Sequence, residues 1–364
     1  MRSPFIDQLR GWALLGIVVV NAPFLLLSIT GDQPGTRSSL DVMSQALVQC
    51  FATGKFYLIF SFLFGYAVSR FFKVETETGA KRFRGRLWTL ALVGFLHACL
   101  FFVGDILFSY SLLGWILFAL RSKPDRVLVR VAGIAASGAV GLLVILSFPT
   151  AETQLVGGTF DAIMRNGNFG QTVIARFQTW PATLIFLGLL NYCFVIACMT
   201  IGMLAGRHRF LERREDFSSF YSAAGKTGLV LGLPLSIVAT VFWKQSWSVP
   251  LTFASAPLLT AGYVAWFSEF YNRFPKIARI ADASGRMSMT CYLLESIILA
   301  TLGCGWGFGL NGRIGFGATF VCAFGVWISI EFFANLWLKH FDQGPVESMI
   351  GRWTKRDSYS TPGV

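Results

Sequence analysis

Residues 86–110, RLWTLALVGFLHACLFFVGDILFSY, decide the fold of this chain. They form an apolar run that is long enough to cross most of a bilayer, yet the run holds His97 well inside its apolar part. Gly104 and Asp105 interrupt the run, and a second apolar segment then continues to Arg121. The pattern predicts a tight helical hairpin with an imidazole buried in one leg and a carboxylate at the bend.

A histidine at membrane depth has two interpretations. Ionisable groups inside a bilayer are costly and are functional candidates by default, which favours a chemical role for His97. A neutral histidine can also form a hydrogen bond between two packed helices and serve the structure alone. The position of His97 in its segment does not decide between these interpretations.

The composition predicts an all-α, polytopic integral membrane protein. Hydrophobic residues make up 54% of the 364 positions and charged residues only 14%, whereas soluble domains carry roughly 25% charged residues. The apolar runs are far longer than the strands of a membrane barrel. The seven cysteines form no C-x-x-C pair and lie mostly in apolar runs, so they indicate small buried side chains and neither a disulfide framework nor a metal site.

Windows of about 20 apolar residues predict about ten spans. The spans are 11–29, 51–72, 87–103, 105–120, 127–148, 182–206, 225–243, 250–270, 288–304 and 314–338. With the N-terminus inside, 25 of the 31 basic residues fall in cytoplasmic segments. The other six are Arg37, Lys55, Arg165, Arg176, Lys244 and Arg313. The positive-inside rule therefore places both termini in the cytoplasm. It also explains the net charge of +12 without a nucleic-acid partner.

The chain is expected to form a single membrane domain over residues 1–364. Its parts are an N-terminal five-helix half at 1–148, an extracytoplasmic cap at 149–181, a C-terminal five-helix half at 182–343 and a cytoplasmic tail at 344–364. The cap is expected to be partly helical and to cover the outer mouth.

Polar residues within the spans are the candidates for chemistry. They are Asn21, Lys55, Ser61, Tyr66, His97, Asp105, Tyr110, Asn191, Glu295 and Glu331, with Asp7, Arg10 and Arg286 at the inner rim. Eight residues of straight helix would separate His97 from Asp105 by about 12 Å, and the bend would shorten this only in part. Lys55 is the alternative neighbour of His97 at that depth. Glu295 has Arg286 or Arg10 as candidate partners.

Several short motifs, taken together, resemble the YeiB family of bacterial inner-membrane proteins, which carry a C-terminal domain of unknown function numbered 418. The motifs are 7–17 (DQLRGWALLGI) with Asn21, 54–56 (GKF), 60–65 (FSFLFG), 94–98 (GFLHA), 104–107 (GDIL) with Tyr110, 285–290 (GRMSMT), 292–294 (YLL), and 344–347 (GPVE) with Arg352. The resemblance covers essentially the whole chain. Cys291, Glu295 and Ser348 depart from the family's usual Asn, Gln and Trp.

The family is distantly similar to the transmembrane acyltransferase superfamily, whose members share a core of roughly ten helices. That resemblance implies transfer of an acyl group, often acetyl, from cytoplasmic acyl-CoA to an extracytoplasmic sugar or similar acceptor. One branch of the superfamily has its catalytic histidine at the end of the first helix, where this chain has Asn21. A catalytic role for His97 is therefore a hypothesis from burial and is not carried over from that branch.

The leading hypothesis is a membrane acyltransferase with acyl-CoA as co-substrate and no metal. His97, Asp105 and Lys55 are the predicted catalytic residues. The predicted donor- and acceptor-binding residues are Asp7, Arg10, Asn21, Ser61, Tyr110, Arg286, Tyr292 and Glu295. Expected partners are membrane lipids, the acyl donor and an acceptor hydroxyl or amine. Helices rich in small residues allow a homodimer.

The alternative is a transporter or permease for a small molecule or lipid, in which the same buried residues relay protons. No internal repeat supports it. A cytoplasmic groove that meets an outer pocket at His97 favours the enzyme, whereas a central site between two related bundles favours transport. A structural or assembly role comes last because it leaves the buried charges without a purpose.

Overall fold

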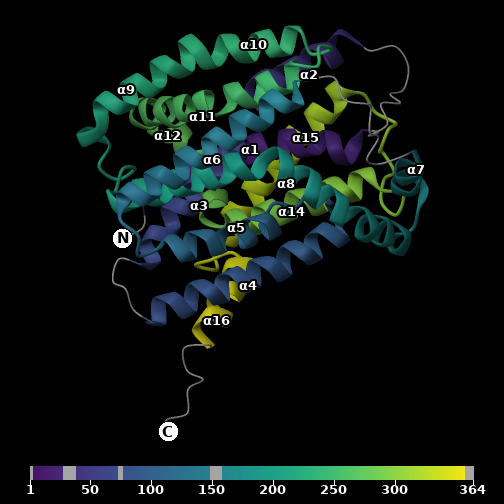
Figure 1. Cartoon of the computed structure of the whole chain (residues 1–364). Helices are drawn as coiled ribbons and strands as arrows, with labels where there is room; N and C mark the ends of the chain where they lie inside the picture. The colour runs from purple at the N-terminus through teal and green to yellow at the C-terminus, as the bar shows by residue number, and fades with distance from the viewer. Residues whose placement is uncertain (1–2, 28–37, 73–76, 148–157, 357–364) are drawn as a thin grey trace.

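The computed structural model describes residues 3–27, 38–72, 77–147 and 158–356, and these residues form helices and no strand, which confirms the all-α prediction (Figure 1). The α-helices are α1 (Pro4–Leu26), α2 (Ser39–Phe51), α3 (Phe56–Phe71), α4 (Glu77–Leu100), α5 (Leu107–Leu120), α6 (Asp125–Leu146), α7 (Gly158–Asn166), α8 (Phe169–Arg207), α9 (Ser218–Thr227), α10 (Leu233–Val241), α11 (Ser248–Arg273), α12 (Pro275–Ala278), α13 (Asp282–Arg286), α14 (Ser288–Gly303), α15 (Phe316–Trp337) and α16 (Pro345–Arg356).

Several of these helices have the length and composition of membrane spans. Within the described residues there are six, at Pro4–Leu26, Ser39–Arg70, Asp125–Leu146, Arg214–Val241, Ser248–Arg273 and Phe316–Trp337. A seventh is obtained if Phe169–Phe186 and Asn191–Arg207, which are bent by 68°, count as one span. Two further apolar helices, α5 and α14, are shorter, with 14 and 16 residues. The chain is thus a multi-pass membrane protein, while the number ten and the cytoplasmic termini stay predictions.

The predicted hairpin is present. α4 ends at Leu100 and α5 begins at Leu107, and the two helices pack against each other. Gly94 allows this approach, because a Cβ at Gly94 would lie 2.3 Å from the backbone nitrogen of Phe108 and 2.7 Å from Oδ1 of Asp105. Only glycine leaves room for the second leg at that level.

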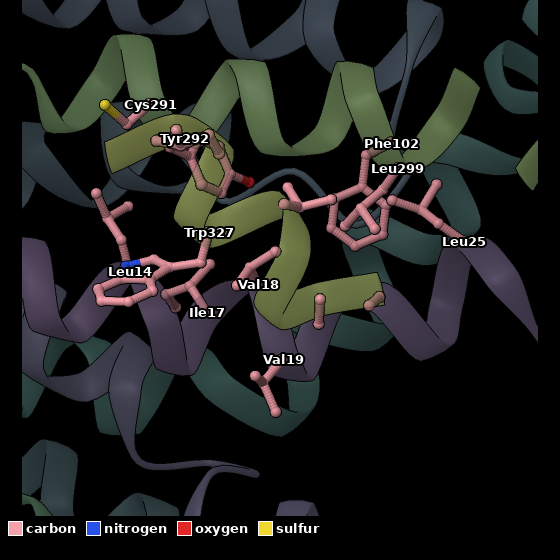
Figure 2. Close-up of a cluster of buried hydrophobic side chains, with 14 of the residues drawn as sticks. Leu14, Ile17, Val18, Val19, Leu25, Phe102, Cys291, Tyr292, Leu299 and Trp327 are labelled. Carbon is pink, nitrogen blue, oxygen red and sulfur yellow. The ribbon is translucent and has the colours of Figure 1, made fainter. Parts of the chain in front are cut away.

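α1 lies at the centre of the helix packing and contacts α13, α14 and α15. At the crossing with α13 a Cβ on Gly285 would lie 1.6 Å from the carbonyl oxygen of Asp7, so the two backbones touch. Further along α1, Leu14 and Ile17 belong to the largest buried apolar cluster, and Figure 2 shows them beside Trp327 of α15. The first helix is therefore packed among the last ones, and residues 1–148 and 182–343 share one core.

Two predicted boundaries fall inside or beside helices. The division after residue 181 lies within α8, which begins at Phe169 and continues through Pro181. Residues 149–157 of the predicted cap lie outside the described residues, and α7 accounts for the helical part that follows them. The predicted tail contains α16, which packs against α4 and α14 and lies below α4 in Figure 1. Residues 357–364 are outside the described part.

Candidate functional site

His97 and Asp105 form a hydrogen-bonded pair that is closed to solvent. Nδ1 of His97 lies 2.7 Å from Oδ2 of Asp105, and their side chains are 2% and 0% exposed. The expected separation of about 12 Å is wrong because the estimate assumed a straight helix. α4 ends at Leu100, three residues after His97, and the chain turns back before it reaches Asp105.

The carboxylate of Asp105 is held by the start of the next helix. Its Oδ1 accepts a hydrogen bond from the backbone N–H of Phe108, at 2.9 Å, in the first turn of α5. Helix N-termini favour negative charge and offer unpaired N–H groups, so an aspartate suits this position. An ionised carboxylate only accepts hydrogen bonds, and we therefore assign the proton of the short contact to Nδ1 of His97.

The second nitrogen of His97, Nε2, is buried and has no hydrogen-bond partner among the described residues. Aromatic rings surround the imidazole: the ring centroids of Phe101 and Phe102 lie 6.5 Å away and that of Tyr292 lies 5.3 Å away. With the proton on Nδ1, Nε2 carries a free lone pair. A carboxylate that orients an imidazole in this way is the arrangement of a general base.

One cavity, which we call the asparagine cavity, lies on the Asp105 side of the pair. It has a volume of about 580 Å³ and is lined by Asn21, Asn191 and Asn311 together with many apolar side chains. The other polar lining residues are Thr53, Tyr57, Asp105, Ser109, Tyr110, Arg176, Thr183 and Tyr192. A mainly apolar cavity of this size with a few polar groups is typical of a small-molecule site.

A second cavity, the arginine cavity, is lined by Arg10, Arg86 and Arg286 and has a volume of about 270 Å³. Tyr292 and Glu347 also line it. The carboxylate of Glu347 accepts hydrogen bonds from the first turn of α14, at Met289 and Thr290. The cavity thus combines three cations with one carboxylate that is already bonded to a helix terminus.

The two cavities share a wall made of Ile17, Ile106 and Tyr110. His97 itself lines neither cavity, but it contacts lining residues of both. Asp105, through the hydrogen bond, and Phe102, through ring packing, line the asparagine cavity, and Tyr292, through ring packing, lines the arginine cavity. The backbone N–H of Ile106 also points to the hydroxyl of Tyr292, at 3.4 Å. The His–Asp pair therefore lies within the partition between the cavities.

Ser61 and Tyr110, both predicted to bind substrate, are brought together. Their hydroxyl oxygens are 2.8 Å apart, and each lies 2.8 Å from the carbonyl oxygen of Tyr57. This cluster ties α3 to α5 beside the shared wall. Asn21 lines the asparagine cavity from α1.

Lys55 has partners away from His97. Its ammonium is 0% exposed and donates to the carbonyl oxygen of Gln49, at 3.1 Å, and to the hydroxyl of Ser236, at 3.0 Å. Lys55 lines neither cavity. It joins the break between α2 and α3 to α10.

The remaining predicted residues divide into two groups. At the inner rim, Arg10 forms an ion pair with Asp7 at 3.3 Å and shares the arginine cavity with Arg286. Glu295 is 1% exposed, and its Oε1 has no partner. Within the described residues it forms no ion pair with Arg10 or Arg286, so the expected pairing is absent.

Three residues of the site were not predicted: Arg176, Tyr192 and Glu347. Arg86 belongs to the basic inner segment 81–86, whose charge was expected to attract the phosphates of CoA, and it lies nine residues into α4. Arg176 was counted only as an external cation, although it lies in α8 and is 1% exposed. An arginine within a long apolar helical stretch was the available signal.

Comparison with known proteins identifies relatives across most of the chain. The family described as "Protein of unknown function (DUF418)" matches residues 205–357. The chain is 29% identical to Uncharacterized protein YxaH of Bacillus subtilis strain 168, over 95% of this chain and 92% of that one. It is 28% identical to Uncharacterized protein YeiB of Escherichia coli K12, over 98% and 97% of the two chains. No solved structure matches.

Proposed function

This chain belongs to the YeiB family, and we propose that it is a membrane-embedded acyltransferase that uses acyl-CoA as donor and a hydroxyl or amine as acceptor. The observation that carries the proposal is the buried His97–Asp105 pair, which lies between a cavity rich in arginine and a larger, mainly apolar cavity. Two substrates that approach from opposite sides would meet at this pair.

The chemistry that we propose is general-base acyl transfer. Nε2 of His97 accepts the proton of the acceptor hydroxyl while that oxygen attacks the thioester carbonyl carbon. The tetrahedral adduct then expels the CoA thiolate, which takes the proton from Nε2, so the products are an acyl ester and free CoA. Asp105 keeps the proton on Nδ1 and stabilises the imidazolium that forms in between.

The arginine cavity suits the donor. The phosphates of CoA are multiply charged anions, and guanidinium groups bind phosphates through two parallel hydrogen bonds. Arg10, Arg86 and Arg286 supply three such groups beside Tyr292. The acyl chain, which we take to be acetyl, would extend past Ile106 towards His97, and the amide of Asn21 would orient the acceptor from the other cavity.

The membrane topology is part of the proposal. We infer ten spans with both termini in the cytoplasm of a bacterium, which requires α4, α5 and α14 to cross or re-enter the bilayer in addition to the long apolar helices. The arginine cavity contains Arg10 near the start of α1 and would then open to the cytoplasm, where acyl-CoA is made.

Calorimetry with acetyl-CoA and free CoA on the purified protein tests the proposal, together with slow hydrolysis of the thioester as a readout that needs no acceptor. We expect micromolar binding and hydrolysis that disappears in His97→Gln. His208→Gln is the matched control, because His208 pairs with Asp125 at 2.8 Å but is more than half exposed. Full activity in His97→Gln would overturn the mechanism.

A transporter is the second candidate, and the shared wall favours it. Three residues line both cavities, and Glu295 and Glu331 each have one buried carboxylate oxygen without a partner, as proton carriers do. Proteoliposome flux of an acceptor analogue that is independent of acyl-CoA and driven by a proton gradient would support transport over the enzyme.

A further inference from the structure

Arg176 is a buried cation without a buried anion. Its side chain is 1% exposed and lines the asparagine cavity from α8. One Nη donates to the carbonyl oxygen of Leu100, at 2.9 Å, and the other contacts Sγ of Cys304, also at 2.9 Å. Within the described residues it has no carboxylate partner inside ion-pair distance. A charge removed from water is normally paired, so this arrangement calls for a counter-ion.

Arg176 also has spare hydrogen-bonding capacity. A guanidinium has five N–H groups, and the bonds to Leu100 and Cys304 occupy two of them. Leu100 is the last residue of α4, where the helix dipole attracts a cation and holds the guanidinium in place. The remaining N–H groups can accept an oxyanion in the bidentate geometry typical of arginine.

The rest of the cavity indicates what the oxyanion is attached to. Its lining is mainly apolar, and two of its aromatic residues, Phe24 of α1 and Phe186 of α8, are 57% and 42% exposed. The side of the cavity at which these two residues lie thus presents exposed apolar side chains, which suit the interior of a bilayer. A ligand that enters there would carry apolar chains as well as a charge.

We propose that the asparagine cavity binds an anionic amphiphile whose phosphate or carboxylate pairs with Arg176, and that this molecule is the acyl acceptor. The identity of the acceptor rests on the proposed function, whereas the anion site does not. The hydroxyl that is acylated would lie between Arg176 and the shared wall, near the polar groups of Asp105 and Asn21.

Binding without acyl-CoA tests the anion site. The probes are short-chain phosphatidylglycerol, the matching zwitterionic phosphatidylcholine and soluble glycerol phosphate, added to the purified full-length protein in uncharged detergent. We expect the anionic lipid to bind at least tenfold more tightly than the zwitterionic one and to raise the melting temperature more. Equally tight binding of glycerol phosphate would support the anion site and assign it to a soluble acceptor. Equal binding of the two lipids would overturn it.

Variants of Arg176 connect the binding to the residue. Arg176→Gln should lower the affinity for phosphatidylglycerol to that for phosphatidylcholine. Arg176→Lys, which keeps the positive charge, should keep part of the preference for the anionic lipid. Arg313→Gln, an exposed arginine that does not line the cavity, should bind like the wild type. If Arg176→Gln fails to fold, the Arg176→Lys variant and the melting shift of the wild type still decide the question.

The outcome is separable from that of the acyltransferase test. Anion binding that depends on Arg176, combined with no response to acyl-CoA, would leave the anion site standing and remove the enzyme. An unchanged lipid preference in Arg176→Gln would remove the anion site and leave the His97 chemistry to its own test.

Discussion

His97 and Lys55 are both buried ionisable side chains next to a break between two helices, and they differ in how many of their polar atoms are occupied. Nζ of Lys55 holds Gln49 of α2 and Ser236 of α10 together. His97 commits one nitrogen to Asp105 and leaves the other buried without a partner, in a partition between two cavities. Both residues satisfy the same sequence criterion of a charge at membrane depth.

The difference teaches that burial alone does not identify a reacting group. A buried polar atom without a protein partner has a cost that folding does not repay, and such an atom in contact with residues that line a cavity is a candidate for chemistry. A buried polar atom whose bonds join separate helices has a structural reason to be there. Lys55 belongs to the second kind and His97 to the first.

The largest expected effect is that of Asp105→Asn. The amide oxygen can still accept from Phe108, so the start of α5 should form, but an amide nitrogen facing Nδ1 moves the imidazole proton to Nε2 and removes the base. We expect the rate of acyl transfer to fall about 10²- to 10⁴-fold, the usual contribution of a general base. Steady-state kinetics with acyl-CoA measure this, and the KM for the donor should stay within a few-fold of the wild type.

Asp125→Asn is the control for that variant, because Asp125 forms a comparable pair with His208 on the surface. An equal loss of rate in both variants, or none in Asp105→Asn, would contradict the assignment of the base.

Gly94→Ala should weaken both the fold and the reaction. The added methyl group would lie 2.3 Å from the backbone of Phe108 and 2.7 Å from Asp105, and therefore the legs of the hairpin must separate. Overpacking of this kind destabilises by about 1–3 kcal/mol. Because the same shift moves the carboxylate from His97, turnover per folded molecule should fall as well. Thermal unfolding and kinetics on one preparation measure both effects.

Gly133→Ala in α6 provides the reference, since nothing lies within 4 Å of a Cβ there. Alanine has the better helix propensity, so this variant should be neutral or more stable by up to about 1 kcal/mol. Similar changes in stability and turnover for the two glycine variants would show that the close approach of α4 and α5 at Gly94 does not hold His97 and Asp105 together.

Lys55→Met should separate stability from activity. The substitution keeps the length of the side chain and removes the donor to Gln49, which leaves a carbonyl in the last turn of α2 without its partner. An unsatisfied buried acceptor costs about 1–3 kcal/mol. Turnover per folded molecule should stay near that of the wild type, as measured by kinetics after correction for the folded fraction. A hundredfold loss of turnover with an unchanged melting temperature would restore Lys55 to the catalytic group.

How far the sequence predicts the site depends on the range of the interactions. The hairpin at residues 86–110 follows from a local apolar run with a Gly–Asp interruption, and the structure confirms it. The 2.7 Å contact of His97 with Asp105 could not be derived, because it depends on where α4 stops. A helix end that differs by a turn changes such a distance by about 5 Å.

Longer-range partners were out of reach for a different reason. The bond of Lys55 to Ser236 spans 181 positions, and that of Arg176 to Cys304 spans 128. Nothing in the residues near either position indicates which distant helix will pack there. Charge patterns placed both residues on the outer side of the membrane, but only tertiary packing distinguishes a cation that is bonded across helices from one that faces a cavity.

Glu347→Gln should have the smallest effect of these substitutions. It extends the comparison to a carboxylate that, like the ammonium of Lys55, has its hydrogen bonds satisfied by another helix. Both of its oxygens are occupied by α14: Oε1 by the N–H groups of Met289 and Thr290, and Oε2 by the hydroxyl of Thr290. A glutamine still accepts from the backbone, so the loss is mainly that of a negative charge at a helix N-terminus. We expect about 0.3–1 kcal/mol less stability in thermal or denaturant unfolding.

The same variant makes the arginine cavity more positive, because Glu347 lines it together with three arginines. Binding of acyl-CoA, measured by calorimetry, should therefore be unchanged or tighter, with a steeper dependence on salt. Glu269→Gln, an exposed glutamate on α11, should change neither quantity. Weaker donor binding in Glu347→Gln would mean that this carboxylate contacts the donor itself. In that case a side chain whose polar atoms all have protein partners could still take part in substrate binding, and hydrogen-bond occupancy would not separate structural from functional residues in this fold.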